Sequence, residues 1–562
     1  MRTVIGIDLG TTNSAVACMD GNEPLVIPND RGNRITPSVV AINGPDDVLV
    51  GESAKNQAVV NAASTITAAK RVMGSGTVFT IGGRTYTPEQ VCSYILRKLR
   101  KDAETFLGQP VQDAIITVPA HFSEAQRRAT QEAGRLAGLR VRRLLNEPTA
   151  AALAYAYRTP GDRRILVYDL GGGTFDVTCL QKEGNTFSVL ASEGDNHLGG
   201  VDFDALLLDR VLGEFERNSE LNFRSEPILM QQLSEMVERA KIELSTSEST
   251  RILIPFFGGA GAGAPLHLSY EVNRNEFYDL IDALVRKTVK LTMAAVRSAG
   301  FGLRGVDSLV LSGGSSRIPL VHTYLKRALN LEQVSLVNPD EIVAMGAAIQ
   351  GALLSDQSDT VHVRDVTAYN LGVEIEGDHF VTILPRNSPV PARTHRTFTT
   401  VSDRQSSVEI HVLQGEEPAA SRNISLGRFL LSGIQEARRG EARVQVSFEI
   451  DEDALVWVTA RDLRTGAQQN VKVTPVSDGT GAALDIEVAD RVAALVERVE
   501  QMYAQEQFRL DAEFRAEIEH TIRRASEATS GADLRALHEC HLALETIIGE
   551  LHVELGRSEA EQ

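Results

Sequence analysis

Two copies of one short pattern constrain the fold of this chain more than any other feature. Val4–Thr12 reads VIGIDLGTT, and Ile165–Thr174 reads ILVYDLGGGT. Each is an apolar strand that ends in an aspartate, which can hold a metal ion through water. The glycines that follow leave backbone N–H groups open to an anion, because no Cβ blocks the approach. Asp8 and Asp169 are 161 residues apart (169 minus 8), so the repeat predicts a duplicated domain that grips one phosphate chain from both sides.

Length and charge limit the remaining choices. A single core rarely grows beyond ~300 residues, so a chain of 562 residues predicts about two to four domains. A formal net charge of -18 argues against a general nucleic-acid or anionic-membrane binder. No apolar run approaches the ~18 residues of a membrane span, and no leader precedes the first strand. Four cysteines without a CxxC pair predict a reducing cytoplasm.

Residues 1–355 alternate strands with helices, which predicts an α/β domain with a mostly parallel, covered sheet. The expected strands include Ala114–Val118, Ile165–Tyr168 and Ser308–Leu311. The expected helices include Pro88–Phe106, Ser123–Ala137 and Glu276–Ser298. The glycine-alanine segment Gly258–Pro265 is expected to join two strands at the surface.

The pattern changes twice in the rest of the chain. Residues 356–366 begin polar and predict a linker, and residues 367–478 show the period of two that is typical of an antiparallel β-sandwich. Residues 479–562 predict a helical hairpin that packs on itself, with a break at Thr529–Gly531. Its two apolar stripes are Val488, Val492, Leu495, Val496 and Val499, and then Leu534, Leu537, Leu544, Ile548, Leu551 and Leu555.

A third glycine turn and two isolated charges are further candidates. Gly313 and Gly314 in SGGSSRIP could admit a base and ribose close to the backbone, and Arg317 could stack over adenine. A tight strand-to-helix turn with a surface arginine explains the same residues equally well. Lys70 alone would be a solvated lysine, and Glu147 alone a helix-capping residue before Pro148. No Gly-Lys dipeptide occurs, which rules out a P-loop.

Seven ordered motifs carry a resemblance to a known family. They are IGIDLGTTNS, ITVPAHFSEAQR, NEPTAAALAY, DLGGGTFDVT, GDNHLGGVDFD, ERAKIELS and SGGSSRIP. Together they resemble the ATPase domain of DnaK-type chaperones, the seventy-kilodalton heat-shock family, which is built on the actin and sugar-kinase fold. HVLQGE at His411–Glu416 resembles that family's peptide-binding domain. The resemblance implies a duplicated, ribonuclease-H-like ATPase domain, a β-sandwich and a helical lid.

The resemblance also implies roles at the nucleotide site. ATP or ADP would be bound with Mg²⁺, which Asp8, Glu147 and Asp169 would surround through its waters, and K⁺ is an optional further ion. Lys70 and Asp176 would position the attacking water, and Thr174 would contact the γ-phosphate and accept autophosphorylation. Thr11, Thr12 and Asn13 would hold the phosphates together with Gly171, Gly172, Gly173 and Thr174. Gly10, Gly199 and Gly200 are further implied nucleotide-binding residues. The implied adenosine-binding residues are Glu238, Lys241, Ser245, Gly313, Gly314, Ser315, Arg317 and Asp340.

Communication and peptide binding follow from the same resemblance. Pro119 and Arg127 would report the nucleotide state, with Asp365 in the linker; a strand-end proline and a solvated arginine are the simpler explanations of the first two. The implied peptide channel comprises Val373, Ile375, Glu376, Phe398, Val401, Val408 and Ile410. Without the resemblance, inward apolar residues of a sandwich would be core.

The chain also departs from the family pattern. Its linker, Val361-His-Val-Arg-Asp365, alternates apolar and polar residues and suits an edge strand, whereas the family usually has a run of leucines. Glu376 and Val401 stand at the arch over the channel, where Met and Ala are usual. The helical tail is short, which indicates a specialised, short-lid member.

The resemblance therefore predicts an ATP-dependent chaperone that binds extended apolar segments of unfolded proteins. A J-domain protein and a nucleotide-exchange factor would be its partners. A small-molecule kinase and an actin-like filament protein are the alternatives on the same fold, but neither explains residues 367–562. A module that exchanges nucleotide on another chaperone would not need Lys70, Glu147 and Thr174 together.

Overall fold

The computed structural model describes most of the chain before residue 473 and part of the chain after it. The described residues are 3–44, 47–157, 159–219, 224, 226–258, 266–302, 305–330, 338–355, 361–472, 492, 495–496, 499–500, 502–503, 512–531, 540, 544 and 547. By its contacts the chain divides into two units, Met1–Pro475 and Val476–Gln562. Each unit is considered by itself.

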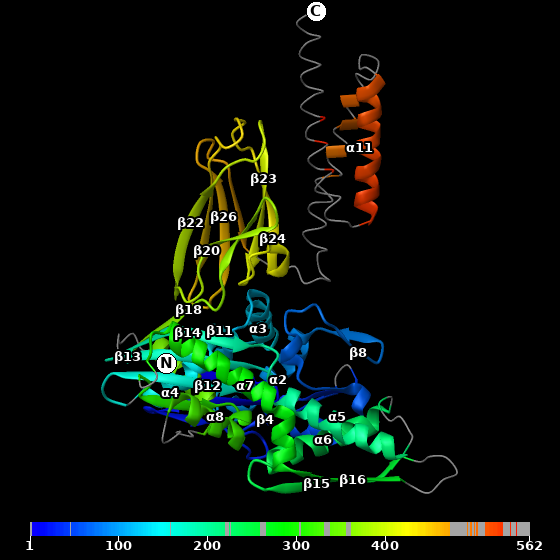
Figure 1. Cartoon of the computed structure of the whole chain (residues 1–562), viewed down its shortest axis with the longest axis vertical. Coiled ribbons are helices and arrows are strands. Elements are labelled where there is room, and N and C mark those ends of the chain that lie inside the picture. The colour runs from blue at the N-terminus through cyan, green and yellow to red at the C-terminus, as the bar shows by residue number, and fades with distance from the viewer. Residues whose placement is uncertain are drawn as a thin grey trace, which may run out of the picture. The chain divides into compact units, whose positions relative to one another are not determined.

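The first unit contains two large sheets with the same strand pattern (Figure 1). In the first sheet, β1 (Val4–Asp8), β2 (Asn13–Asp20) and β3 (Glu23–Val26) form an antiparallel meander, and β10 (Asp113–Val118) and β11 (Arg140–Asn146) add to β1 in parallel. In the second sheet, β12 (Arg163–Leu170), β13 (Phe175–Glu183) and β14 (Thr186–Asp195) repeat the meander, and β17 (Ser308–Ser312) adds to β12 in parallel. The repeated pattern agrees with a duplicated domain.

The expectation of a mostly parallel sheet was wrong, because both sheets are mixed. The first three strands of each half are joined by short turns, such as the four residues between β1 and β2. A turn of that length can join only antiparallel neighbours, since a parallel pair needs a long crossover. The expected strands at residues 114–118, 165–168 and 308–311 are all present within β10, β12 and β17.

Helices pack on both faces of these sheets, and the three expected helices are confirmed. They are α2 (Pro88–Leu107), α3 (Glu124–Leu136) and α7 (Arg274–Ser298). α2 and α3 each begin at a capping box, formed by Thr87 with Gln90 and by Ser123 with Gln126. In each box the cap side chain accepts the N–H of the glutamine, and the glutamine side chain accepts the N–H of the cap residue. The remaining helices are α1 (Glu52–Gln57), α4 (Glu147–Ala156), α5 (Gly200–Ser219), α6 (Pro227–Glu243), α8 (Pro319–Leu329) and α9 (Ile342–Ser355).

Shorter elements complete this part of the chain. The small strands are β4 (Thr36–Pro37), β5 (Val40–Ile42), β6 (Val48–Val50), β7 (Thr65–Ile66), β8 (Phe79–Ile81) and β9 (Arg84–Tyr86). The antiparallel pair β15 (Ser249–Gly258) and β16 (Leu266–Asn273) confirms two strands around the glycine-alanine segment, of which residues 259–265 lie outside the described part. The 3₁₀ turns are η1 (Ala62–Ser64), η2 (Ala69–Val72), η3 (Gly314–Arg317) and η4 (Ala420–Arg422).

The predicted sandwich is confirmed as two four-stranded antiparallel sheets. One sheet runs in the order β20 (His379–Leu384), β19 (Leu371–Ile375), β23 (Ser407–Gln414) and β24 (Ile424–Ser432). The other runs β22 (Ala392–Phe398), β25 (Val444–Ile450), β26 (Val456–Asp462) and β27 (Gln468–Lys472). Their inner faces share one core around Phe448, which is fully buried.

The linker residues form a strand that belongs to the second large sheet. β18 (His362–Val366) pairs in parallel with β14 and antiparallel with β21 (Pro389–Val390). A strand is therefore present where the alternation of the linker sequence suggested one, but it lies between β14 and β21 and not at the edge of the sheet. The polar start of the linker, at residues 356–360, lies outside the described residues.

The second unit is helical where it is described. α11 (Ala512–Gly531) runs through Thr529 and Ser530, so the expected break does not precede Gly531. Its apolar cluster joins three stretches rather than two, with Val492 and Val499, Ile518 and Ala525, and Cys540, Leu544 and Ile547. The hairpin prediction missed α11 because its apolar positions are few. Val488, Leu534, Leu537, Ile548, Leu551 and Leu555 lie outside the described residues.

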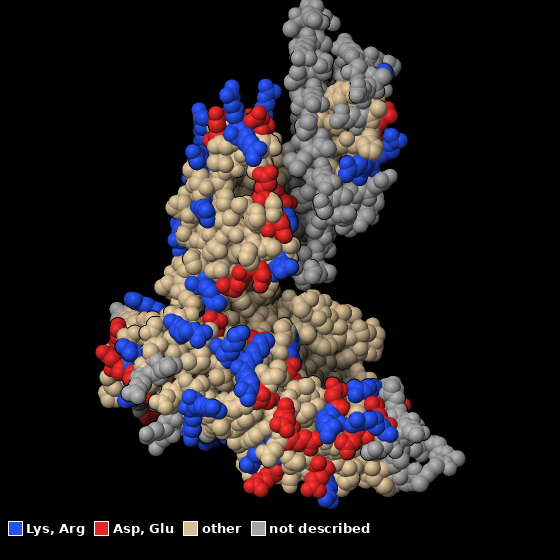
Figure 2. All heavy atoms as spheres, viewed as in Figure 1, with Lys and Arg blue, Asp and Glu red and all other residues tan. Residues whose placement is uncertain are grey.

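The surface of the protein carries both basic and acidic side chains (Figure 2). Figure 2 shows Lys and Arg mixed with Asp and Glu over the lower part of the visible face, and wide uncharged areas elsewhere on it. Among the described helices, none combines the length and the apolar character needed to cross a bilayer.

Candidate functional site

A cavity of about 610 Å³ opens between the two halves of the duplicated domain. Most of the predicted nucleotide-site residues line it, and they come from strand ends, turns and helices of both halves. These residues are Asp8, Gly10, Thr11, Thr12, Asn13, Lys70, Glu147, Asp169, Gly171, Gly172, Thr174, Glu238, Lys241, Ser245, Gly313, Gly314, Ser315, Arg317 and Asp340. Side chains separated by up to 332 residues (340 minus 8) thus meet in one place.

The twin turns both line this cavity, and they approach each other closely at its edge. One turn lies between β1 and β2 and the other between β12 and β13, at the same place in each meander. A Cβ on Gly172 would come within 2.1 Å of the Thr12 hydroxyl oxygen, so the contact between the turns requires glycine. Backbone N–H groups at two facing glycine turns form a concave anion site.

Lys70 and Glu147 form a buried ion pair in the cavity. Lys70 lies in the 3₁₀ turn η2 and is 4% exposed; its Nζ donates to Glu147 Oε1 at 2.6 Å and lies 5.4 Å from the centre of the Phe122 ring. Glu147 is the first residue of α4 rather than the residue before it, and Asn146 takes the cap position. The solvated-lysine explanation therefore fails, since burial of a lone ammonium would be costly without its partner.

Three carboxyl groups share this low-dielectric space. Burial raises the pKa of Asp8 to about 6 and that of Glu147 to about 7, and Lys70 opposes both shifts. Burial, and then repulsion from Glu147, Asp176 and Asp8, raises the pKa of Asp169 well above its ordinary value. A bound cation would relieve this repulsion, and carboxylate oxygens suit Mg²⁺. Among the described residues no three His, Cys, Asp or Glu side chains are arranged to ligate an ion directly.

The opposite side of the cavity carries the predicted adenosine residues. Arg317 pairs with Asp340 at 2.5 Å, so a carboxylate orients its guanidinium, and the side chain is 47% exposed, as the surface-arginine alternative also expects. Lys241 pairs with Asp204 at 2.6 Å and donates to the Gly200 carbonyl at 3.1 Å. These contacts fix the wall of the cavity against which a flat ring could lie.

Glu238 also takes part in a contact that the sequence analysis missed. Its carboxylate accepts a hydrogen bond from Lys55 of α1 at 2.7 Å, so an ion pair joins the two halves beside the cavity. The two residues are 183 apart, and only the fold brings them together.

Four predicted residues lie behind the cavity wall rather than on it. Gly173, Gly199, Gly200 and Asp176 do not line the cavity. The Gly200 and Val201 N–H groups donate to the carbonyls of Gly171 and Gly172 at 3.0 and 2.7 Å, so this second turn braces the phosphate turn. Asp176 is opposite Asp169 in the β12–β13 ladder and is buried.

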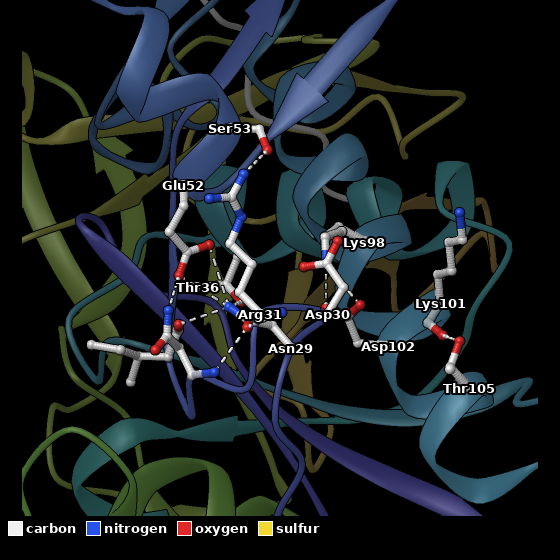
Figure 3. Close-up of polar contacts among 12 residues, drawn as sticks. Asn29, Asp30, Arg31, Thr36, Glu52, Ser53, Lys98, Lys101, Asp102 and Thr105 are labelled. Atoms are coloured by element: carbon white, nitrogen blue, oxygen red, sulfur yellow. Dashed lines mark hydrogen bonds and ion pairs between the residues drawn. The ribbon is translucent and has the colours of Figure 1, made fainter.

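Asn29 lies at the centre of a polar network beside the cavity (Figure 3). The Asn29 amide donates to the Ile35 carbonyl at 3.2 Å and to Glu52 Oε1 at 3.1 Å, and its oxygen accepts the Arg31 N–H at 3.0 Å. Ile35 lines the cavity and Glu52 begins α1, the helix of Lys55. Asn29 was not a candidate from the sequence, although an Asn-Asp dipeptide before Arg-Gly signals a turn stabilised by its own side chain.

The predicted communication residues are buried and polar. Arg127 is 4% exposed; its guanidinium donates to Asn146 Oδ1 at 2.7 Å and to the carbonyl of Asp453 in the sandwich at 3.4 Å. Asp365 of the linker strand accepts a hydrogen bond from Thr149 of α4 at 3.0 Å. Pro119 directly follows β10, and its carbonyl accepts the Phe122 N–H at 3.2 Å. The solvated-arginine explanation of Arg127 is therefore wrong.

The contacts between α3 and the sandwich were not foreseen. Glu124 is buried, pairs with Arg128 at 2.5 Å and accepts the Val456 N–H at 3.3 Å. The Arg128 guanidinium lies 5.9 Å from the centre of the Trp457 ring. Asp453 in turn accepts the Leu144 N–H at 3.0 Å. No periodicity in the sequence signals the contacts of Glu124 with Val456 and of Asp453 with Leu144, because these partners are more than 300 residues apart.

The predicted channel residues divide into three groups. Val373 and Ile410 are 3% and 4% exposed and belong to the sandwich core, and Phe398 and Val408 pack partly against it. Ile375 and Val401 are 38% and 47% exposed. The exposed Glu376 carboxylate lies 3.9 Å from Arg439. The structure thus does not gather these seven side chains into one described cavity.

The fold and the cleft define a class of protein in which a duplicated α/β domain with a cavity between its halves is joined through a strand to an antiparallel β-sandwich. The sequence comparison gives the family. Residues 4–80 and 76–562 match the family described as Hsp70 protein. The chain belongs to the Hsp70 family, whose members are ATPases with a chaperone role.

Proposed function

We propose that this protein is an ATP-dependent chaperone in which hydrolysis in the cleft controls binding of extended apolar peptide segments by the sandwich. One observation supports the coupling most directly: α4 begins with Glu147 in the cleft, and two residues later Thr149 donates to Asp365 of the linker strand at 3.0 Å. A change at Glu147 on nucleotide binding therefore reaches the strand that leads into the sandwich within one helical turn.

In the cleft, positioning and charge neutralisation would supply the catalysis. The turns at Gly10–Asn13 and Gly171–Thr174 would hold the phosphates through backbone N–H groups. Asp8, Glu147 and Asp169 would hold Mg²⁺ through its waters, and the ion would neutralise charge on the phosphates. Lys70, fixed by Glu147, would orient the attacking water, and Thr174 would lie beside the γ-phosphate.

We further propose the domain limits, partners and setting that the family resemblance implies. The ATPase domain would comprise residues 1–355, the linker 356–366, the sandwich 367–478 and a short lid 479–562, in a DnaK-type member of the cytoplasm. A J-domain protein and a nucleotide-exchange factor would assist it. The exposed Ile375 and Val401 are the channel candidates that a peptide can reach without rearrangement of the core.

The experiment is single-turnover ATP hydrolysis by the full chain, with and without an extended apolar peptide. We expect the peptide to stimulate hydrolysis and Lys70→Ala to abolish it, because Lys70 is the cation that opposes all three raised pKa values among the described residues. Lys101→Ala, on the exposed face of α2, is the matched control and should leave the rate unchanged. Hydrolysis that ignores the peptide would contradict the coupling, and hydrolysis that survives Lys70→Ala would contradict the assigned site.

A further inference from the structure

A short segment after β10 contacts both the candidate catalytic site and the sandwich. It comprises residues 119–122, between β10 and α3. The Phe122 ring lies beneath Lys70, with 5.4 Å between Nζ and the ring centre. The neighbouring His121 is 4% exposed and points to a different part of the site.

The His121 ring is bonded to Asp176. Its Nδ1 lies 2.8 Å from Asp176 Oδ1, and the His121 backbone N–H donates to the same oxygen at 3.3 Å. We assign the ring proton to Nδ1, because the same carboxyl oxygen also accepts the His121 backbone N–H. Asp176 is 1% exposed and opposes Asp169 in the β12–β13 ladder, and Asp169 lines the cavity. His121 therefore fixes a carboxylate that lies directly behind the catalytic wall.

The backbone of His121 is held by the sandwich. Its carbonyl accepts the Tyr369 hydroxyl at 2.9 Å and the Asn196 amide at 2.5 Å. The Tyr369 ring meets the His121 ring edge-on, with 5.7 Å between centres. Burial raises the pKa of Tyr369, so its hydroxyl remains a donor. Tyr369 lies between the linker strand and β19, in the segment that enters the sandwich.

A glycine makes room for the pair. A Cβ on Gly194 would lie 2.5 Å from His121 Nδ1 and 2.7 Å from Asp176 Oδ1, both too close for any real contact. The His121–Asp176 contact thus depends on a residue without a side chain at this point of β14.

We propose that His121 is a positioning residue that links Tyr369 of the sandwich to Asp176 behind the cleft and thereby sets the rate of ATP hydrolysis. This inference rests on the proposed ATPase. When Tyr369 holds the His121 carbonyl, the ring N–H keeps Asp176 in one orientation beside Asp169. Asn196 is the second donor to that carbonyl, so loss of the Tyr369 hydroxyl removes one of two hydrogen bonds that fix the position of His121.

The test compares single-turnover hydrolysis and ATP affinity in full-length variants. His121→Phe keeps a ring for Tyr369 but removes the donor, and we expect the rate to fall about tenfold, the effect of roughly one lost charged hydrogen bond. ATP affinity should stay within about twofold, because His121 does not line the cavity. His121→Asn places an amide donor near the Nδ1 position and should restore the rate to within about threefold of the original.

Two further variants separate positioning from general damage. Tyr369→Phe should slow hydrolysis about threefold alone and add nothing in the His121→Phe background, because both act on one path. Gly194→Ala should reproduce His121→Phe, whereas Gly213→Ala, where a Cβ meets open space in α5, should have no effect.

The outcomes are distinct. A normal rate in His121→Phe, an equal loss in His121→Asn, or additive losses in the double variant would each overturn the inference while the proposed ATPase stands. A full-length protein that does not hydrolyse ATP at all would overturn the proposed function itself.

Discussion

The positions of the predicted site residues agree with one site in the cleft but not in the sandwich. In the cleft, the predicted residues of three glycine turns and two isolated charges converge on one cavity. In the sandwich, seven predicted channel residues separate into core, partly buried and exposed positions. A glycine turn at a strand end defines a backbone geometry, and hence a site, whereas an inward apolar residue satisfies a core and a channel equally well. The first four predictions below test this difference, from the largest expected effect to the smallest.

The cleft should fail when one of its turns acquires a side chain. Gly172→Ala places a Cβ 2.1 Å from the Thr12 hydroxyl oxygen, so the two turns must separate. We expect ATP affinity to fall by about a hundredfold or more, since the proposed phosphate site is formed by both turns together. Isothermal titration with ATP measures this. Gly184→Ala, in the open turn between β13 and β14, has a strained backbone but no contact and should bind ATP normally.

In the sandwich, substitutions of core residues and of exposed channel residues should have different effects on stability and on peptide binding. Ile410→Ala removes a core side chain, and we expect the urea transition seen by Trp457, the only tryptophan, to lose about 2–5 kcal/mol. Val401→Ala, at a side chain that is 47% exposed, should change stability by less than about 0.5 kcal/mol but weaken peptide binding. If Ile410→Ala left stability unchanged, Ile410 would not be core, and the division of the channel residues would be wrong.

Local features could be predicted from the sequence, whereas contacts between distant residues could not. Local signals located α2 and α3, because their capping boxes lie within four residues, and they located Asp8 and Asp169 at strand ends. They did not locate His121, Glu124 or Lys55, whose roles depend on partners 55 to 332 residues away. They also missed the mixed sheets, where turn length and not apolar content sets strand direction.

The contact between α3 and the sandwich should strengthen as the pH falls. Burial raises the pKa of Glu124 to about 7, against Arg128 and the Val456 N–H, which lower it. Burial likewise raises the pKa of Asp453 to about 6, against the Leu144 N–H, which lowers it. A raised pKa means that the docked form takes up protons. The contribution is therefore complete below about pH 4 and is lost as the pH rises through 6 to 7.

Trp457 fluorescence between pH 5.5 and 8 measures this docking, because the ring lies beside Arg128. In Glu124→Gln, the fluorescence should depend less on pH around pH 7, since the amide stays neutral. A profile that strengthens with rising pH would contradict the assignment.

The ion pair between Lys55 and Glu238 should have the smallest effect. The Lys55 side chain is 38% exposed, so the pair is screened by water and we expect Lys55→Ala to speed nucleotide release only about two- to fivefold. Stopped-flow displacement of a fluorescent nucleotide measures the rate. Lys101→Ala serves as the control, and an unchanged rate in Lys55→Ala would show that the pair does not hold the two halves together.

The central claim is that the cleft controls the sandwich through the linker strand. The most direct measurement is the release rate of a fluorescent extended apolar peptide from the full chain, in ATP and in ADP. We predict that ATP speeds release by about tenfold or more, and that Thr149→Val, which removes the hydrogen bond to Asp365, reduces that difference. Equal release rates in the two nucleotides would contradict the account.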